Sequence, residues 1–261
     1  MIDQHKHAKA QPALVALFVS DVHLRASLPN TVTAFFNFLH QHGKQARQLF
    51  LLGDLFEYWA GDDAIDTPFN QTVISALRAV SDTGTQLYWI AGNRDFLVGE
   101  QFAKATGASL LPDPSTIVIN GKKILLAHGD QQCTDDLDYI AFRNQVRQPA
   151  WKNQFLSMPL DERTAMIEGM RQDSKMEQQN KTAAIMDVNS EAIHQLFSDS
   201  NAEMIIHGHT HRPAIHTHEL GVRYVLPDWE CDAEEKRGGW LALYEDGQLT
   251  RFDVDGIPFI V

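Results

Sequence analysis

The sequence has few cysteines and no paired cysteine motif. Cys133 and Cys231 are its only two cysteines, and neither belongs to a C-x-x-C pair. A disulfide framework or a zinc ribbon needs several cysteines at short spacing, so the sequence favours neither. The composition fits a protein of a reducing compartment, and nothing marks Cys133 as a nucleophile.

Long apolar runs are also missing. The polar segment Met1–Gln11 leads to an apolar run of only seven residues, 13–19, which is too short for the core of a secretory signal followed by a cleavage site. No stretch approaches the roughly 18 consecutive apolar residues of a membrane-spanning helix. We therefore expect no export signal, and we expect any contact with a membrane to be peripheral.

Positive charge is scarce, because 22 Lys and Arg face 34 Asp and Glu for a formal net charge of -12. A chain of this charge repels a phosphate backbone, so no nucleic-acid partner is expected. Hydrophobic residues make up 44% and charged residues 21%, which excludes a disordered, collagenous or coiled-coil chain. The length of 261 residues suits one main domain with room for an insertion.

Short apolar runs alternate with amphipathic helical patterns. Five runs have the length and composition of β-strands, namely residues 13–19, 49–52, 86–91, 123–127 and 203–206. Apolar residues at helical spacing predict helices over Thr31–His40 and Phe69–Val80. Strands that alternate with helices predict an α/β layered fold with at least partly parallel strands.

Further strand signals surround a long helical segment. Turn residues at 111–115 and 120–123 favour a hairpin, and strand-like runs return at 223–226, 240–244 and 249–254. Between them, residues 135–198 carry helical patterns and five of the seven Met, and residues 143–181 hold seven Lys or Arg against five Asp or Glu. We interpret 135–198 as a helical cap inserted into a core of 13–134 and 199–261, after a polar extension of 1–12.

Polar clusters follow each of the five strand-like runs. They are Ser20-Asp21-Val22-His23, Gly53-Asp54, Gly92-Asn93-Arg94-Asp95, His128-Gly129-Asp130 and His207-Gly208-His209-Thr210-His211. One such cluster is an ordinary turn. Five of them at the carboxyl ends of strands in an α/β sheet predict one shared site, because that edge of the sheet is where ligands bind.

The residue types in these clusters indicate a metal centre. Imidazole and carboxylate together suit first-row ions such as Mn, Fe, Co or Zn. Seven candidate ligands are too many for one ion and fit two ions that share a carboxylate, an arrangement that activates water for phosphoryl displacement. We consider His211 a residue that could orient a ligand. The other seven His are left out as tail, surface or loop residues, namely His5, His7, His40, His42, His194, His216 and His218.

The ordered motifs DxH, GD, GN, HG and GHxH, from Asp21 to His211, resemble the calcineurin-like metallophosphoesterase superfamily. The text between them resembles one of its families, the UDP-2,3-diacylglucosamine pyrophosphohydrolases of lipid A biosynthesis. The segments that carry this resemblance are GDLFEYWAGDD (53–63), GNRDFLVG (92–99), HGDQQCTDD (128–136), AIMDVN (184–189) and HGHTHRP (207–213). It implies a layered β-sandwich flanked by helices, with a helical cap.

The resemblance also implies the ligands and the reaction. Asp21, His23, Asp54 and His209 would hold one metal, and Asp54, Asn93, His128 and His207 the other, with Asp54 bridging. Two Mn²⁺ per chain are the expected ions, although other first-row ions are chemically possible. The implied reaction is hydrolysis of UDP-2,3-diacylglucosamine to UMP and 2,3-diacylglucosamine 1-phosphate by a water that the two metals activate.

Arg94 distinguishes this chain from phosphoprotein phosphatases of the superfamily, which have His at that position to assist a poor leaving group. Arg is always charged and is a poor proton donor, but it holds a phosphate or stabilises transition-state charge. Such a residue suits a phosphomonoester leaving group, whose second pKa is about 6. The alternative is a surface ion pair between Arg94 and Asp95.

The resemblance places the acyl chains under the cap. Its segment SKMEQQNK (174–181) implies that Ser174, Gln178 and Lys181, together with Asp136, contact the substrate, as would Asn93, Arg94 and His207. Gln178 departs from the Asn usual in that family. The flexible Met side chains suit an acyl cavity, but on composition alone an ordinary helical core is the better explanation.

The implied location is the cytoplasm, in peripheral contact with the inner membrane through basic residues of the cap, and a solvated, salt-bridged helix face is the alternative for those residues. No obligate protein partner is expected. Two other functions stay open. One is a superfamily hydrolase with another phosphodiester substrate, and the other is a scaffold without catalysis. The acidic stretch Asp228–Glu235 has no explanation in the sequence.

Overall fold

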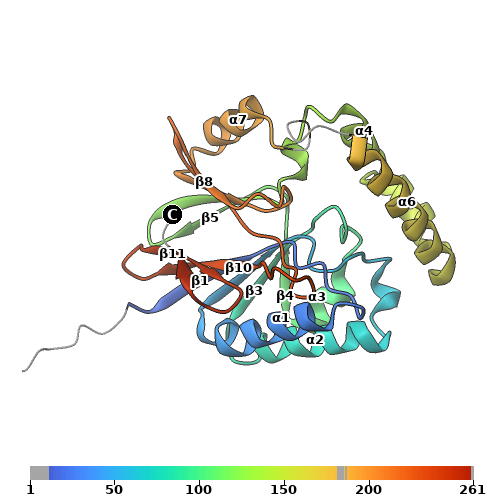
Figure 1. The fold of residues 1–261 in the computed structure, drawn as a ribbon, viewed down its shortest axis with the longest axis horizontal. Helices are drawn as coiled ribbons and strands as arrows, with labels where there is room; N and C mark the ends of the chain where they lie inside the picture. Colours follow the sequence, from blue (N-terminus) through green and yellow to red (C-terminus); the bar gives the residue numbers. More distant parts are fainter. Residues whose placement is uncertain (1–11, 181–184, 186, 260–261) are drawn as a thin grey trace, which may run out of the picture.

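Two β-sheets lie face to face in this computed structural model, and helices cover the outer face of each (Figure 1). The structure describes residues 12–180, 185 and 187–259, and for residues 172–180 and 259 it describes the backbone alone. The layers therefore run helix, sheet, sheet, helix. This arrangement confirms the predicted α/β layered fold.

The first sheet has seven strands in the order β12-β11-β10-β1-β2-β3-β4. Its parallel half consists of β1 (Leu14–Val19), β2 (Gln48–Leu52), β3 (Gln86–Ile90) and β4 (Ala108–Leu111). Its antiparallel half consists of β10 (Gly239–Tyr244), β11 (Leu249–Asp253) and β12 (Pro258–Phe259). The chain therefore returns to the centre of this sheet after the second sheet is complete.

The second sheet has five strands in the order β5-β6-β7-β9-β8. The strands are β5 (Ser115–Ile119), β6 (Lys122–Leu126), β7 (Met204–His207), β8 (Ala214–His218) and β9 (Gly221–Val225). Strands β6, β7 and β9 are parallel, and the hairpins β5–β6 and β8–β9 close the two edges. The carboxyl ends of β6 and β7 lie beside those of β1 and β2.

The buried apolar side chains of the central strands alternate between two cores. In β1, Leu17 and Val19 face the helices of the first sheet, while Ala16 and Phe18 face the second sheet. This alternation follows from the two-residue period of a strand. Both faces are buried, which explains why these strands are nearly continuous apolar runs.

Three helices cover the outer face of the first sheet, and one covers the second. The three are α1 (Pro29–Gln41), α2 (Pro68–Ser81) and α3 (Glu100–Thr106), with short 3₁₀ turns η1 (Gly43–Gln45), η2 (Asp62–Ala64) and η3 (Asp130–Gln132) in the connections. Helix α7 (Ser190–Ser200) packs on the second sheet through Ile193 and Phe197. Both α1 and α2 begin with Pro at the first helical position, which Pro tolerates because its missing N–H has no partner there.

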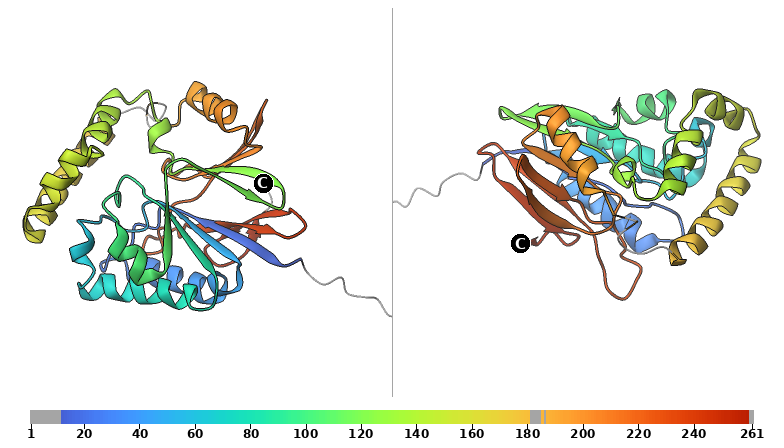
Figure 2. Two further views of the ribbon diagram at one scale, coloured as in Figure 1. Left: turned by 180° about the vertical axis from the view of Figure 1, so that it is seen from behind. Right: turned by 90° about the horizontal axis from the view of Figure 1, so that it is seen from above.

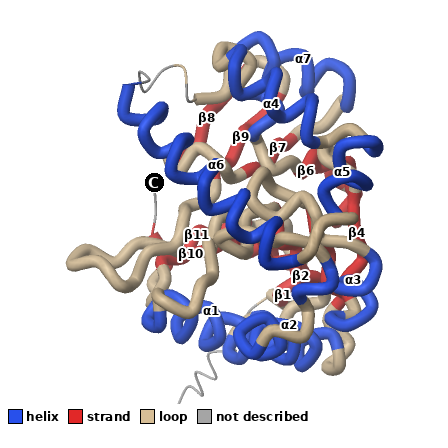
Figure 3. Tube along the Cα trace, turned by 90° about the vertical axis from the view of Figure 1, so that its right-hand side faces the viewer, coloured by secondary structure: helices blue, strands red, loops and turns tan. Residues whose placement is uncertain are grey.

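Three further helices form an arm beside the sandwich (Figures 2 and 3). They are α4 (Leu137–Val146), α5 (Pro149–Leu156) and α6 (Leu160–Asn180). Phe155 and Met158 join the arm to the main apolar core. The predicted end of the insertion, residue 198, falls inside α7, which packs on a sheet.

The predicted strands and helices of the first half agree with the structure within about two residues. The sequence interpretation missed α3, β4, β8 and β12. Helix α3 has only seven residues, and β4 and β8 are largely exposed edge strands, so none of them shows a strong apolar pattern. Among the described residues, none of the helices combines the length and apolar character that crossing a bilayer requires.

Candidate metal centre and adjoining cavity

The polar clusters that follow five strands meet at one edge of the sandwich. Asp21 follows β1, Asp54 follows β2, Asn93 follows β3, and His128 follows β6. His209 comes two residues after the end of β7. The five strands come from both sheets, so the site lies where the carboxyl ends of the two sheets converge.

Several of these residues leave their strand in a left-handed backbone conformation. Seven described residues other than Gly have a positive φ, and five of them are Asp21 (52°), His23 (51°), Asp54 (53°), His209 (67°) and His211 (53°). Each residue of this kind costs about 1–3 kcal/mol and persists where the surrounding structure requires it. Backbone strain at five residues whose side chains converge points to a functional centre.

Backbone hydrogen bonds hold the strained turns in register. The amides of Asp21 and His23 donate to the carbonyls of Gly53 and Asp54, each at 3.0 Å, and Leu24 donates to Leu55 at 2.7 Å. The parallel pairing of β1 and β2 thus continues into the loops that carry the first three candidate ligands. A side chain at Gly208 has no room, because a Cβ there would lie 2.1 Å from the Asp21 carboxylate.

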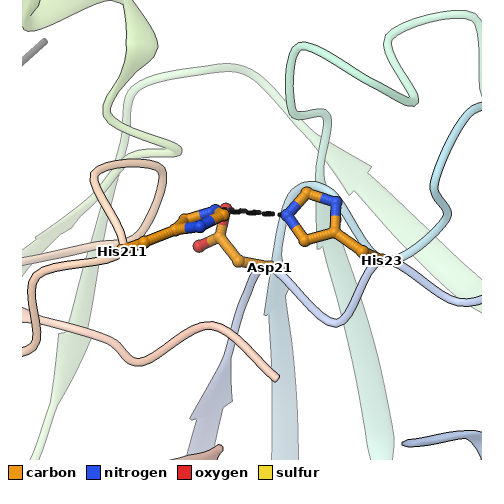
Figure 4. A group of neighbouring side chains, drawn as sticks. All are labelled: Asp21, His23 and His211. Atoms are coloured by element: carbon orange, nitrogen blue, oxygen red, sulfur yellow. Dashed lines mark hydrogen bonds and ion pairs between the residues drawn. The ribbon is translucent and has the colours of Figure 1, made fainter. Parts of the chain in front are cut away.

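Asp21, His23 and His211 form the first group of candidate ligands (Figure 4). The Nε2 atoms of the two imidazoles lie 3.2 Å apart. Asp21 Oδ1 lies 3.5 Å from His211 Nε2 and 4.0 Å from His23 Nε2. These three atoms face a common point, as ligands of one ion do.

Asp54, His128, Asn93 and His209 form a second cluster beside the first. Asp54 Oδ2 lies 3.7 Å from His128 Nε2, and Asp21 belongs to the same group. Asn93 Oδ1 lies 3.0 Å from both His128 Nε2 and His209 Nδ1. The amide of Arg94 donates to the other Asp54 oxygen at 2.8 Å.

His207 is placed differently from the other predicted ligands. It is buried at the end of β7, where Nδ1 lies 2.9 Å from the Gly208 carbonyl and Nε2 lies 3.0 Å from the Arg223 guanidinium. Both ring nitrogens therefore face other partners. The structure brings Asp21, His23, Asp54, Asn93, His128 and His209 together, and it adds His211 where the sequence interpretation has His207.

The donor set fits a divalent metal ion. Asp21 Oδ1 is buried and, among the described residues, receives no hydrogen bond of acceptable geometry. Burial keeps the pKa of His23 well below its usual range, and burial together with the charge of His128 lowers the pKa of His209 to about 4. Both imidazoles are therefore neutral at neutral pH, which is the form that binds metals.

Two of the remaining groups, Asp54 and His128, hold protons that an ion would displace. Burial raises the pKa of Asp54 to about 7, although the charge of His128 opposes this. Burial lowers the pKa of His128, but the carboxylates of Asp54, Asp21 and Asp130 raise it to about 9. For Asp21, burial raises the pKa, but the interactions with His211, His128 and His23 lower it by more, so the net shift is downward.

Arg94 lines the cavity beside the centre, and no ion pair joins it to Asp95 in the described part of the chain. The Asp95 carboxylate is completely buried and accepts hydrogen bonds from the amides of Leu55 (2.9 Å) and Gly92 (2.8 Å). Asp95 therefore fixes the loops that carry Asp54 and Asn93. The alternative of an Arg94–Asp95 surface ion pair is excluded.

A cavity of about 580 Å³ adjoins the centre. Its polar end contains His23, Asp54, Asn93, Arg94, His209 and His211. The apolar walls come from the core loops and the arm, and they include Trp59, Phe96, Phe142, Trp151, Phe155 and Met170. A single space thus joins the candidate metal ligands to an apolar compartment.

The predicted substrate contacts on the arm are only partly described. Asp136 lines the cavity and caps α4 by accepting from the amide of Tyr139 at 3.1 Å. The side chains of Ser174 and Gln178, and the whole of Lys181, lie outside the described residues. Of the described Met in the arm, Met170 lines the cavity and Met158 packs on the core, so aromatic residues supply most of the apolar wall.

The acidic stretch after β9 supports both the centre and α1. Asp228 is buried, and its Oδ2 lies 3.5 Å from His211 Nδ1. Asp232 accepts from the amides of Asn30 and Thr31 at the start of α1. The sequence interpretation missed these roles, because each contact joins segments that are distant in the sequence, and it did not single out Arg212 in the cavity wall.

Comparison with known proteins gives a consistent result. The family model described as calcineurin-like phosphoesterase matches residues 14–213. The chain is 48% identical to the UDP-2,3-diacylglucosamine hydrolase of Aromatoleum aromaticum, over 84% of this chain and 90% of the relative. It is 42% identical to the protein of the same name from Ralstonia nicotianae, over 89% of this chain and 90% of that relative.

One solved structure, Vacuolar Protein Sorting 29 from Cryptosporidium parvum, matches with a TM-score of 0.50 at 12% identity. The match covers 96% of this chain and 97% of that chain. At this identity the match shows the shared fold alone.

The affinity of the centre for Mn²⁺ should rise with pH. His128, with a pKa of about 9, carries a proton that must leave before it binds an ion, and Asp54, with a pKa of about 7, adds a second proton at lower pH. We expect about a tenfold gain in affinity for each pH unit between about pH 7 and pH 8, and a steeper gain below about pH 7. Competition with a fluorescent chelator measures the dissociation constant. An affinity that does not change over this pH range would contradict the expectation.

Proposed function

This chain belongs to the calcineurin-like phosphoesterase family, and from that premise we propose that it hydrolyses the pyrophosphate bond of UDP-2,3-diacylglucosamine. The products are UMP and 2,3-diacylglucosamine 1-phosphate. The names of the relatives from Aromatoleum aromaticum and Ralstonia nicotianae support the substrate. The proposed place of the reaction is a step of lipid A biosynthesis.

The observation that carries this proposal is the continuity of the metal centre with an apolar cavity. A phosphodiesterase for water-soluble substrates needs the polar end of this space and gains nothing from walls of Trp59, Phe142, Trp151 and Phe155. A substrate with two acyl chains on a sugar next to a pyrophosphate has the matching distribution of apolar and charged groups.

We propose two Mn²⁺ in this centre, with one change from the ligand set that the sequence interpretation gives. Asp21, His23, Asp54 and His211 would hold the first ion. Asp54, Asn93, His128 and His209 would hold the second. His207 is left out because both of its ring nitrogens face other partners, and His211 enters because its Nε2 faces Asp21 and His23.

The chemistry divides between the ions and the protein. Two divalent ions held there would lower the pKa of a water and offset the negative charge of the phosphates. Arg94 supplies a fixed positive charge beside them, which suits the charge that develops on the pyrophosphate. Water adds to the phosphorus of the UMP half, and the bond from that phosphorus to the bridging oxygen breaks.

The leaving group needs no proton from the enzyme. The departing sugar phosphate is a phosphomonoester with a second pKa of about 6, so it is stable as an anion at neutral pH. This explains why Arg, which does not donate a proton, can stand where a general acid would otherwise be required. The walls of the arm exclude water from the acyl chains during the reaction.

We propose that the arm acts as a cap over the substrate, with α4, α5 and α6 as its helices. Asp136 lies in the cavity wall, which supports the proposed contact with the substrate. The contacts of Ser174, Gln178 and Lys181 remain part of the proposal. Because α7 packs on the second sheet, we place the end of the cap before α7.

Purified protein with Mn²⁺ should convert UDP-2,3-diacylglucosamine to UMP and 2,3-diacylglucosamine 1-phosphate. Mass spectrometry of the products measures this, and in ¹⁸O water the label should enter UMP, because water attacks the phosphorus of that half. Asp54→Ala should abolish turnover. Label in the sugar phosphate would refute the direction of attack, and equal activity on a deacylated substrate would refute the role of the apolar cavity.

His211→Ala should weaken the binding of one of the two Mn²⁺ far more than His207→Ala does. His211 Nε2 belongs to the first group of ligands, whereas His207 lies against Arg223. Loss of one ligand or of the partner that orients it typically costs at least ten- to a hundredfold in affinity. Native mass spectrometry with a Mn²⁺ titration counts the ions. Two ions in His211→Ala and one in His207→Ala would restore the sequence-derived assignment.

We also propose peripheral contact between the cap and an anionic membrane surface on the cytoplasmic side of the inner membrane. Several large apolar side chains of the cap are exposed, among them Leu137 at 75% and Leu156 at 41%. Basic residues stand among them in the sequence. Apolar anchors beside basic residues favour an anionic lipid surface.

Leu137→Asp should reduce flotation of the protein with anionic liposomes at moderate salt. Val118→Asp is the matched control, because Val118 is also exposed, at 67%, but lies on the edge strand β5 of the second sheet. The same loss of flotation in both variants would count against docking through the cap.

A further inference from the structure

Each imidazole of the first ligand group has a carboxylate beside its second nitrogen. His211 Nδ1 lies 3.5 Å from Asp228 Oδ2, and His23 Nδ1 lies 3.6 Å from Glu57 Oε2. In both residues Nε2 is the atom that faces Asp21. The far nitrogen of a metal-binding His commonly donates to a carboxylate, which fixes the tautomer and the orientation of the ring.

Glu57 is well placed to orient His23. Its amide donates to the Leu24 carbonyl at 3.1 Å, so the two loops are joined next to the two side chains. Both side chains are only 13% exposed. His23 Nδ1 is buried and forms no hydrogen bond within the described part of the chain, and Glu57 Oε2 lies just beyond hydrogen-bond distance from it at 3.6 Å.

The second oxygen of Glu57 connects this pair to the cap. Glu57 Oε1 forms an ion pair with Arg171 Nη2 on α6. Arg171 also lies over the ring of Tyr58, with its guanidinium carbon 5.8 Å from the ring centroid. By contrast, Asp228 pairs with Arg237, which belongs to the core. Glu57 alone of the two carboxylates joins a candidate metal ligand to the cap.

Another ion pair already attaches the same helix to the same stretch of the core. Arg163 of α6 is 1% exposed, donates to the Ala60 carbonyl and pairs with Asp63. Helix α6 is thus anchored without Glu57. Asp63 does not contact any candidate metal ligand, whereas Glu57 contacts His23.

We propose that Glu57 is a positioning residue that orients His23 for the first metal ion and ties the docking of the cap helix α6 to the binding of that ion. This inference rests on the metal centre of the proposed function but not on its substrate. A bound ion fixes the His23 ring, the ring fixes the Glu57 carboxylate, and the carboxylate fixes Arg171. The coupling is reciprocal, so a docked cap also strengthens metal binding.

Glu57→Ala should weaken the binding of one Mn²⁺ by about ten- to a hundredfold and leave the other unchanged. Glu57→Gln should fall between the wild type and Glu57→Ala, because its amide oxygen can still accept from His23 Nδ1 but carries no charge. Asp63→Asn is the matched control, and its Mn²⁺ affinity should equal that of the wild type. Competition with a fluorescent chelator gives the two dissociation constants.

The double variant Glu57→Ala/Arg171→Met guards against a folding defect, because it removes both charges of the pair. It should fold with a melting temperature near that of the wild type and keep the loss of Mn²⁺ affinity. Wild-type affinity in Glu57→Ala or in this double variant would overturn the role in metal binding.

Hydrogen exchange tests the link to the cap. In the wild type, Mn²⁺ should slow the exchange of the backbone amides of residues 160–171, and in Glu57→Gln it should not, since the charge that holds Arg171 is gone. Asp63→Asn should keep the response to Mn²⁺. A response in Glu57→Gln equal to that in the wild type would overturn the coupling.

These outcomes are separate from the fate of the proposed function. A wild-type protein that binds no divalent ion would remove the metal centre itself. A wild-type protein that binds two ions but does not hydrolyse UDP-2,3-diacylglucosamine would remove the substrate assignment and leave the role of Glu57 to be decided by the affinities and the exchange.

Discussion

The left-handed backbone at the ends of the central strands is the constraint on which the rest of the structure depends. A strand that simply continued would send Asp21 and His23 to the same face of the sheet, two residues apart. The turn at each of these residues instead brings them together with His211 from the other sheet. A turn of this kind is unfavourable for residues with a side chain, so the surrounding structure must stabilise it.

Two features of the fold supply this stabilisation. The pairing of β1 with β2 extends past the strands through the amides of Asp21, His23 and Leu24. The buried carboxylate of Asp95 accepts hydrogen bonds from the amides of Leu55, in the loop after β2, and Gly92, in the loop after β3. The parallel strands therefore form the core and also position the loops that carry the candidate ligands, because each loop begins where a strand ends.

The electrostatics of the centre follow from the same burial. Carboxylates and imidazoles that lie within about 4 Å of one another inside the protein raise or lower each other's pKa, as His128 and Asp54 do. A divalent ion removes the conflict, because it favours the charged carboxylate and the neutral imidazole at once. Asp228 and Glu57 lie beside the outer nitrogens of His211 and His23, where they can orient the two rings.

The sequence was sufficient to predict the central strands, the polar clusters that follow them and the family. It was not sufficient to distinguish the roles of the three histidines of H-G-H-T-H. His207, His209 and His211 alternate with other residues, so a continued strand would place all three on one face. The structure separates them because β7 ends at His207, which stays in the strand beside Arg223, while His209 and His211 lie in left-handed turns. The aromatic wall was also beyond prediction, since tertiary packing alone brings Trp59 and Trp151 to one cavity.

The cap has to be held as firmly as the metal ligands, because the cavity wall belongs to both parts. Asp130 follows the ligand His128 by two residues, is completely buried, and accepts from Tyr139 Oη at 2.6 Å and Arg143 Nε at 2.8 Å, both on α4. At the end of that helix, Arg147 donates to the Gly92 carbonyl at 2.9 Å, next to Asn93. A displacement of α4 would therefore shift the loops of two ligands. The same segments that complete the apolar compartment also fix the polar one, so a single connected structure would position both ends of the proposed substrate.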